Sequence, residues 1–301
     1  MLTLRMSRSV SHSLSIVGAG RLGRALGRRL HRLGWHVGAV VTRSTSTSRA
    51  AARFIGAGNP SVPLTREIVE ADVILLTVPD GALAGVARSL AQLDPKKWRG
   101  KAVLHTSGAL DRKVLQPLAR RGAATGSLHP MQTFSGRSEP NLDGVIFGIE
   151  GDSRARQIAA SIARSLGGVP VIVDGNKKIS YHAAGMMVAG LGLALAEGAT
   201  QVLLSIGFTR RKALQALLPL MREMLRNFEQ HGAHAAWTGP ISRADYGTIA
   251  LHAAALRKHP NELQEAYRGL ARLSARLLSK SHRATLRNLN RVLGKSRRKS
   301  K

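Results

Sequence analysis

The stretch LSIVGAGRLGRAL, residues 14–26, decides the fold. Residues 14–17 form a short apolar run that predicts a buried strand, and a glycine-rich turn follows directly. The helix predicted after this turn rests on leucines at helical spacing, namely Leu22, Leu26, Leu30 and Leu33. A strand, a glycine turn and a helix in this order are typical of the first unit of a dinucleotide-binding α/β domain.

The glycines of this turn have the G-x-G-x-x-G spacing, and each has a physical reason to be glycine. Gly18 allows the tight turn, Gly20 lets a pyrophosphate approach the backbone, and Gly23 permits close packing of helix on strand. The phosphates would lie at the helix N-terminus, where free N–H groups and the helix dipole favour anions. We therefore expect cofactor contacts from Gly18, Ala19, Gly20, Arg21, Leu22 and Gly23. A glycine-rich turn without a ligand is the alternative.

The end of the second predicted strand, residues 36–42, bears on the choice of cofactor. The following residues, VVTRSTSTSR, contain no Asp or Glu that would bind a ribose 2′-hydroxyl. Arg43 and its hydroxyl neighbours instead suit a 2′-phosphate, so NADP(H) is favoured over NAD(H). The expected contacts are Thr42, Arg43 and Ser44, together with Val78, Pro79 and Asp80 after the third core strand. These last three are expected there for position more than for chemistry.

Further strand and helix patterns define the domains. Strands are predicted at 71–79, 101–108, 123–130, 144–151 and 169–175, with helical patterns between several of them. After Asn176 only helical patterns follow, at 178–206, 209–230 (with a kink at Pro219), 241–257 and 260–280. We predict a doubly wound parallel Rossmann sheet and then an all-helical domain. The expected parts are a flexible tail at 1–12, an NADP-binding domain at 13–175, a helical domain at 176–285 and a basic tail at 286–301.

Composition excludes several classes of protein. The 301 residues include no cysteine, which excludes disulfides and thiolate sites and fits a reducing cytoplasm. The formal net charge is +29, but aromatic residues are only 4%, so base-stacking platforms are scarce and nucleic-acid binding by the basic tail is not expected. The apolar stretch 183–206 contains Glu197 and several glycines, which favours a packed helix over a membrane span. Residues 1–13 lack the apolar core of a secretory signal, so we expect a cytoplasmic protein.

Two polar clusters follow neighbouring predicted strands, at the edge of the sheet where ligands bind. One is HTSG, with His105 and Ser107, and the other is SLHPM, with His129. Reduction of a C=O or C=N group needs a proton donor within hydrogen-bond reach, and histidine can supply that proton near neutrality. Serine can only orient the substrate or relay the proton. Polar residues that merely cap strand ends remain the alternative.

The helical region adds further candidates. Lys178 and His182 are four residues apart and share a helix face, so Lys178 could act as a general acid or bind an anion, with Tyr181 beside it. Arg243 in TGPISRAD could bind a substrate carboxylate, or could pair with Asp245 at a helix start. Gln132, in the loop after His129, is a further substrate-binding candidate. No pattern of clustered carboxylates, histidines or cysteines indicates a metal site.

The ordered motifs VGAGRLGRAL, VPDGAL, LHTSGAL, GSLHPMQTF, YHAAG and TGPISRAD, over residues 17–245, resemble a Rossmann-like bacterial family of largely unassigned function. The resemblance covers about residues 13–280. That family is often labelled NADP- or deazaflavin-dependent oxidoreductase-like. It is similar to pyrroline-5-carboxylate reductase, ketopantoate reductase, 3-hydroxyisobutyrate dehydrogenase and prephenate dehydrogenase. The resemblance implies a nucleotide domain and a helical domain of the 6-phosphogluconate dehydrogenase C-terminal type, which forms a homodimer and completes the active site.

The resemblance also implies residue roles. In the hydroxyacid relatives a lysine and an asparagine four residues later bind substrate and donate a proton; Lys178 matches the lysine, and His182 stands at the asparagine position. In the prephenate dehydrogenases a serine and a His-Pro pair contact the substrate, and here Ser107, His129 and Pro130 match them. The continuation MQTF differs from theirs, and Ala189 and Gly190 stand where family members often carry Ser-Asn.

These observations predict an NADP(H)-dependent oxidoreductase that reduces a C=O or C=N group of a small carboxylate-bearing substrate. A 2-keto acid such as ketopantoate, or a cyclic imine, is the expected substrate. Two alternatives remain open: a non-enzymatic NADP(H) sensor or scaffold, and a dehydrogenase of the prephenate or arogenate type.

Overall fold

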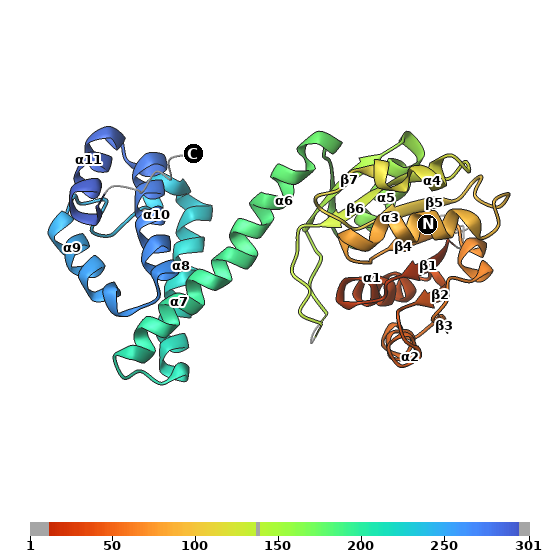
Figure 1. Ribbon diagram of the computed structural model, residues 1–301, viewed down its shortest axis with the longest axis horizontal. Coiled ribbons are helices and arrows are strands. Elements are labelled where there is room, and N and C mark those ends of the chain that lie inside the picture. Colours follow the sequence, from red (N-terminus) through yellow and green to blue (C-terminus); the bar gives the residue numbers. More distant parts are fainter. Residues whose placement is uncertain (1–11, 137–138, 295–301) are drawn as a thin grey trace, which may run out of the picture. The chain divides into compact units, whose positions relative to one another are not determined.

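The computed structural model describes residues 12–136 and 139–294, and the chain divides into two compact units, Met1–Met187 and Val188–Lys301. The first unit contains an eight-stranded sheet with the order β3-β2-β1-β4-β5-β6-β7-β8 (Figure 1). The strands are β1 Ser13–Val17, β2 His36–Val41, β3 Asn59–Ser61, β4 Val73–Leu76, β5 Ala102–His105, β6 Ala124–Pro130, β7 Ile146–Gly151 and β8 Val169–Ile172. The first six have the doubly wound Rossmann order, which confirms the predicted fold class.

One strand pair departs from the all-parallel prediction. β7 runs antiparallel to β6, while every other neighbouring pair of this sheet is parallel. The reason lies in the connection between them: the described part of residues 131–145 contains no helix. A parallel return requires a crossover, usually helical, whereas an antiparallel neighbour can be reached by a loop. The short edge strand β3 was also not predicted from the sequence.

Helices cover both faces of the sheet, and two clusters of buried residues hold them there. Leu14 and Ile16 of β1 belong to the cluster under α1, α2 and α5, whereas Val17 belongs to the cluster under α3 and α4. This division follows from the pleat, because successive strand residues point to opposite faces. The helices are α1 Arg21–Arg32, α2 Thr45–Ile55, α3 Asp80–Gln92, α4 Gln116–Ala119 and α5 Ser153–Ser165, with single 3-10 turns at Arg66–Glu70 and Arg112–Leu115.

The first unit extends past the expected domain boundary at residue 175. A 3-10 turn at Gly175–Lys177 and helix α6, Lys178–Met186, follow β8, and the division between the two units falls after Met187. The physical reason is that the first turn of α6 is bonded to the sheet: Lys178 bonds to Ser127 of β6. The beginning of the predicted helical domain is therefore part of the first unit.

The second unit is helical, as expected. After a π turn at Met187–Leu191 it contains α7 Gly192–Ser205, α8 Arg210–Ala236, α9 Tyr246–Ala255 with a 3-10 turn Leu256–Lys258, α10 Asn261–Leu278 and α11 His282–Leu293. Pro219 lies inside α8, but the residue with non-helical backbone angles is Gly232, with φ 75° and ψ 171°. Gly232 breaks the helix because glycine adopts the positive φ that this break requires, and the kink at Pro219 stays a prediction.

The predicted basic tail begins too early. Residues 286–293 complete helix α11, whose Leu289 and Leu293 are buried with Ile249 of α9 and Ala275 of α10. Because this stretch is rich in Lys and Arg, a helix was not predicted for it. The helix nevertheless has one apolar face, and that face packs in the core of the second unit. Residues 1–11 of the expected N-terminal tail, and residues 295–301 of the basic tail, lie outside the described part of the chain.

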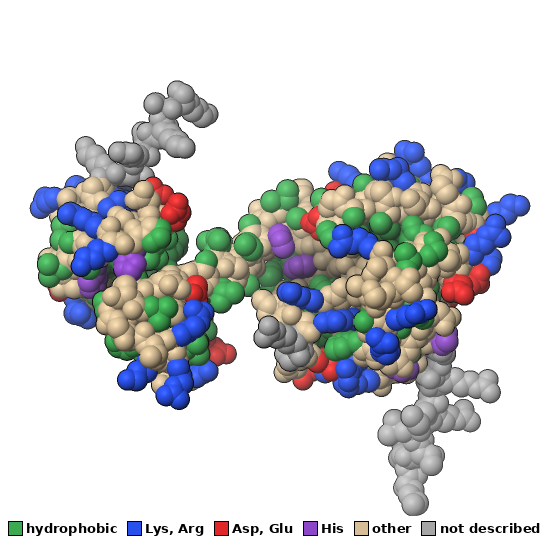
Figure 2. Space-filling model, turned by 60° about the horizontal axis from the view of Figure 1, so that its bottom comes forward, with side chains coloured by type: hydrophobic (Ala, Val, Ile, Leu, Met, Phe, Trp, Pro, Cys, Tyr) green, Lys and Arg blue, Asp and Glu red, His purple; other side chains and the backbone are tan. Residues whose placement is uncertain are grey.

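The helical segment Gly175–Ser205 is long and apolar enough to cross a membrane by length and composition, with a mean hydropathy of 1.5. Its apolar side chains are largely exposed within the described residues; the most exposed are Ile179, Val188 and Leu193. Hydrophobic side chains are visible on the surface of α6 and α7 in Figure 2. The start of the segment carries Lys178, which is buried and bonded to polar groups of the sheet.

Candidate functional site

The glycine loop after β1 is fixed against the end of β4. Gly18 has a φ of 91°, which favours glycine, and a Cβ there would lie 2.5 Å from Val78 Cγ1. A Cβ on Gly23 would collide with the hydroxyl of Thr77, and that hydroxyl donates a 2.7 Å hydrogen bond to the Gly18 carbonyl. Both glycines are therefore required by close packing, as the sequence pattern predicted.

The N-terminus of α1 has the features of an anion site. No side chain caps this helix and no acidic residue lies in its first turn. Gly20 is exposed, and only the Gly18 carbonyl, at 3.8 Å, would come near a Cβ there. The backbone N–H groups of the first turn can therefore meet a ligand phosphate. Arg21 is exposed beside them and Leu22 is half-buried, while Ala19 is buried in the core beneath the loop. These residues fit the pyrophosphate of a dinucleotide.

Thr42, Arg43 and Ser44 lie at the carboxyl end of β2, where α2 begins. Ser44 caps α2 by accepting a hydrogen bond from the Thr47 N–H, and the Thr42 hydroxyl donates to the Ser44 carbonyl at 3.0 Å. Arg43 is exposed and makes no ion pair or hydrogen bond within the described residues. A free guanidinium beside a helix N-terminus and several hydroxyls fits a phosphate monoester.

Residues 78–80, which follow β4, make specific contacts. Pro79 is the N-cap residue of α3 and Val78 packs into the second core cluster. The Asp80 carboxylate accepts a 2.8 Å hydrogen bond from the Ser107 hydroxyl, which links the cofactor side of the sheet to the HTSG turn. Asp80 was expected there for its position more than for its chemistry, and this hydrogen bond is a finding of the structure.

Ser107 has a different environment from the one expected. Its hydroxyl donates to Asp80 and accepts hydrogen bonds from the N–H groups of Ala109 and Leu110. This hydroxyl is therefore committed to the turn and is not free to orient a substrate, in contrast to the sequence prediction. Its backbone carbonyl instead accepts a 3.0 Å hydrogen bond from Lys178 Nζ, so Ser107 positions the lysine.

Lys178 is a buried cation, with only 2% of its surface exposed. Besides the Ser107 carbonyl, Nζ donates to the Ser127 hydroxyl at 2.6 Å. Burial lowers the pKa of Lys178 to about 8, and the opposing attraction of nearby carboxylates, chiefly Glu150, only partly compensates. No carboxylate forms a salt bridge with this lysine among the described residues. A pKa near the physiological range is suited to proton transfer.

His129 lies on β6 two residues after Ser127, so both side chains point to the same face of the sheet. Its ring makes edge contacts with Tyr181 and His182 of α6, with centroid distances of 5.5 Å and 5.6 Å. Tyr181 Oη lies 3.4 Å from His129 Nδ1, and burial raises the pKa of Tyr181. Histidine side chains reach the surface of the first unit in Figure 2. His129 is half-buried and His182 exposed, so these two imidazoles can meet a ligand without rearrangement.

The pKa of His129 is lowered to about 4 by burial first and then by the positive charges of His182 and Lys178. The ring is therefore neutral at pH 7 and offers one N–H donor and one acceptor. The two imidazoles converge on Gly108: a Cβ there would lie 2.5 Å from His182 Nδ1 and 2.7 Å from His129 Nε2. The absence of a side chain at Gly108 keeps both nitrogens in place.

His105 is fully buried, in contrast to its predicted place among the groups that act on a substrate. Its Nδ1 accepts a 3.2 Å hydrogen bond from the Ser107 N–H, which leaves the proton on Nε2. Burial and then the charge of Lys178 lower the pKa of His105 to about 3, so the ring is neutral. The structure gives His105 the role of supporting the HTSG turn.

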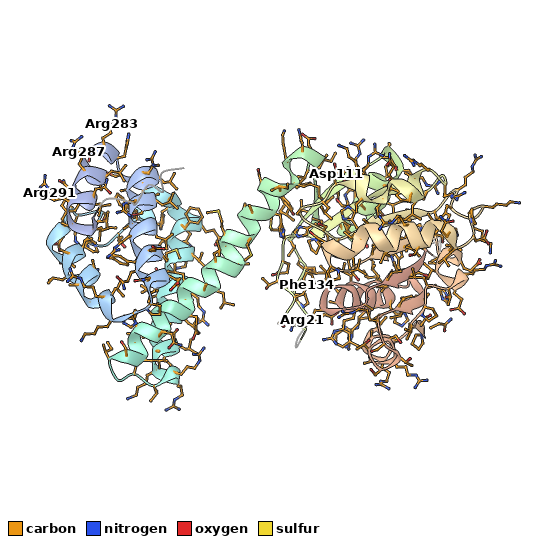
Figure 3. The ribbon with its side chains drawn as sticks, in the orientation of Figure 1. Arg21, Asp111, Phe134, Arg283, Arg287 and Arg291 are labelled. Carbon is orange, nitrogen blue, oxygen red and sulfur yellow. The ribbon has the colours of Figure 1, made fainter. Side chains whose placement is uncertain are left out.

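Two candidates from the sequence remain, Gln132 and Arg243. Gln132 is exposed and donates to the Asn141 carbonyl at 3.2 Å, within the loop that joins β6 to β7. That loop also places Phe134 against the core cluster near α1, and Figure 3 shows Phe134 beside Arg21. Arg243 belongs to the second unit, where it is exposed on the turn before α9. The described residues contain no group of three or more metal-ligating side chains.

Sequence reasoning identified Lys178, His129, Tyr181 and His182, which the structure brings together. It missed Ser127 and Gly108. A signal for Ser127 was present, because a residue two positions before His129 on a strand shares its face. Gly108 gave no signal, because its importance depends on two imidazoles that arrive from different elements.

Two family models match the chain. Residues 4–130 match a Rossmann-like domain, and residues 145–274 match a domain of unknown function, DUF2520. No curated protein matches the sequence.

Several solved structures share the fold over most of both chains. A Bacteroides fragilis protein described as a candidate NADP oxidoreductase is 21% identical, with a TM-score of 0.73, and 92% of this chain and 98% of that one are covered. A reductive aminase from Aspergillus terreus, crystallised with NADPH and ethyl-5-oxohexanoate, is 18% identical with a TM-score of 0.64, over 89% and 94% of the chains. An imine reductase from Streptomyces aurantiacus is 14% identical with a TM-score of 0.61, over 94% and 100%. At these identities the likeness concerns the fold. From its two matched domains, the chain is a Rossmann-like protein that carries a DUF2520 domain.

Proposed function

We propose that this protein is an oxidoreductase that uses NADP(H) to reduce a C=O or C=N group of a small substrate. The observation that carries the proposal is that two sites of complementary chemistry lie at the same edge of one sheet. The anion-binding turn follows β1, and the cluster around His129 and Lys178 lies at the carboxyl ends of the parallel strands β5 and β6. In open α/β sheets ligands bind outside these strand ends. The structural neighbours crystallised with NADPH support the same cofactor.

Arg43 supports the choice of NADP(H) over NAD(H). Arg43→Ala should weaken NADPH binding about 10- to 100-fold, which is the expected loss for a charge-assisted hydrogen-bond pair, and should leave NADH binding nearly unchanged. Fluorescence titration of the purified protein with each nucleotide measures both constants. Arg49→Ala, an exposed arginine farther along α2, is the matched control. Equal loss of NADPH affinity in both variants would show that the effect is general charge and not a 2′-phosphate contact.

NADPH, when bound, supplies a hydride, and the residues of this chain must then hold the substrate and provide a proton. We assign the holding role to His129, whose neutral imidazole can hydrogen-bond the carbonyl or imine of a substrate, with His182 beside it. We assign the proton to Lys178, because its pKa of about 8 leaves it protonated at neutral pH but ready to release the proton. Since Nζ is buried, a substrate reaches it by displacing one of its two hydrogen-bond partners, the Ser107 carbonyl or the Ser127 hydroxyl. Ser127, which accepts the 2.6 Å hydrogen bond from Nζ, is the group next to this proton.

A small carboxylate-bearing substrate fits this proposal best, either a 2-keto acid such as ketopantoate or a cyclic imine. The support is the buried cation of Lys178 with two imidazoles close by that can donate hydrogen bonds, while the Asp80 carboxylate is already engaged by the Ser107 hydroxyl. The relation of this fold to imine reductases and reductive aminases keeps imines in the test set. Oxidation of NADPH, followed by absorbance against a panel of keto acids and imines, tests the substrate class.

Activity measurements also separate the two alternatives, a sensor or scaffold and a prephenate- or arogenate-type dehydrogenase. A nucleotide sensor or scaffold would bind NADPH and turn over no member of the panel. A dehydrogenase of the prephenate or arogenate type would instead reduce NADP⁺ with those substrates. Since the Ser107 hydroxyl is engaged by Asp80 and two backbone N–H groups, its environment favours the reductase over this second alternative.

We also propose a homodimer formed through the helical domain, in the cytoplasm. The support is the set of apolar side chains left exposed on α7 and α8, including Leu193, Leu220 and Phe228. Light scattering coupled to size exclusion should give twice the chain mass of 32.2 kDa. Leu220→Glu should shift the particle toward the monomer, while the exposed Leu33→Glu in the first unit, at the end of α1, should leave the mass unchanged. A monomeric wild-type protein would contradict the proposal.

A further inference from the structure

Helix α11 presents three arginines in a row on its solvent face. Arg283, Arg287 and Arg291 are spaced by four residues, which brings them to one side of the helix at intervals of about 6 Å. Figure 3 shows these side chains extending outward from α11. All three are exposed. Together the three side chains form the α11 arginine face.

The three arginines of the α11 arginine face make no ion pair or hydrogen bond within the described residues, whereas three arginines elsewhere in the unit do. Arg210 forms a salt bridge with Glu197, and Arg226 forms one with Glu223. Arg272 donates to Asn290 and to the Gly294 carbonyl. No acidic residue occurs in the sequence after Glu265, so α11 itself carries no negative charge.

The opposite side of α11 holds the face rigid. Thr285, Leu289 and Leu293 are buried, and the two leucines belong to the core of the second unit. Because the apolar side of α11 is already used, this helix cannot insert into the interface of a lipid bilayer. Its ligand must be bound by charge and hydrogen bonds alone.

We propose that the α11 arginine face binds the phosphate backbone of duplex nucleic acid. Each guanidinium can form a bidentate pair with a phosphate, and a duplex offers the dense, regular negative charge that an evenly spaced row of cations requires. Helix α11 carries no Phe, Tyr or Trp on which unpaired bases could stack, which favours a duplex over a single strand. A second copy of this face is equally cationic and would be repelled by it, so the dimer proposed above does not form through α11. The binding is independent of base sequence, because phosphates carry no sequence information.

The test is the salt dependence of binding to a fluorescent DNA duplex of about 20 base pairs, followed by anisotropy. In the triple variant Arg283→Gln, Arg287→Gln, Arg291→Gln, the magnitude of the slope of log K against log salt should fall by about 2.7, since each phosphate neutralised by an arginine adds about 0.9 to it. Affinity at low salt should fall by about tenfold or more. Thermal unfolding should stay near wild type because the substituted side chains are exposed.

A matched triple variant removes the same charge elsewhere. Arg88, Arg120 and Arg121 are exposed in the first unit and make no ion pair there within the described residues. Their change to Gln should leave the slope nearly unchanged. Equal effects of the two triple variants would assign binding to net charge and overturn the proposal. Loss of binding to vesicles containing phosphatidylserine, with no binding to the duplex, would assign the face to membranes and overturn it as well. NADPH titration should be unaffected by the α11 variant.

Discussion

Lys178→Met is expected to lower kcat by about 100- to 10,000-fold, the usual contribution of a positioned general acid. Methionine fills a similar volume but cannot hold a proton, so the loss concerns chemistry more than packing. The affinity for NADPH should change little, because the lysine lies at the ends of β5 and β6 and not at the glycine loop. Steady-state kinetics with the substrate found in the panel, together with nucleotide titration, gives both numbers.

The neighbouring lysine provides the control. Lys177 is exposed and forms a 2.9 Å ion pair with Asp174, so Lys177→Met should retain wild-type turnover. Lys178→Arg separates charge from proton transfer, since arginine keeps the charge but does not release its proton. In the wild-type protein kcat should be constant below pH 8 and fall above it, because the protonated lysine is the active form and its pKa is about 8. If Lys178→Arg retains both turnover and this basic limb, Lys178 is not the proton donor.

The sequence was sufficient for the nucleotide-binding half of the fold because its signals are local. The apolar run at residues 14–17, the glycine spacing and the leucines of α1 are each recognised from residues that lie close together in the sequence. Two predictions were wrong, the direction of β7 and the start of the basic tail. The direction of β7 depends on the loop after His129, and the helical residues 286–293 looked like a basic tail because their buried leucines are scarce among cations.

The candidate site was predictable only as a set of chemical types. Strand ends placed His129 and Ser107 at one edge, and helical spacing placed Lys178 and His182 on one face. Which atoms meet was not predictable, because it depends on burial: Lys178 is enclosed and the Ser107 hydroxyl is saturated by its own turn. The sequence suggested that serine would orient the substrate, but the structure gives it the task of holding the lysine through its carbonyl.

Gly108→Ala is expected to lower kcat/KM about 100-fold, since small displacements of reacting groups have effects of this size. Gly108 does not have a positive φ, so its backbone can accept alanine without strain. The obstacle is steric and specific: the new methyl group would lie 2.7 Å from His129 Nε2 and 2.5 Å from His182 Nδ1. Both imidazoles must move, and the substrate-holding geometry changes with them. Kinetics with the identified substrate measures the effect.

Gly85→Ala is the matched control for that substitution. Gly85 lies in α3, and a Cβ there would meet nothing within 4 Å, so the change should leave activity intact and stabilise the helix by up to about 1 kcal/mol. Thermal unfolding of Gly108→Ala should show a folded protein, which separates a displaced pair of histidines from a collapsed turn. Because the HTSG turn is held by Asp80 and by Lys178, we expect the turn to survive and the imidazoles to give way. Full activity of a folded Gly108→Ala protein would mean that neither His129 nor His182 contacts the substrate.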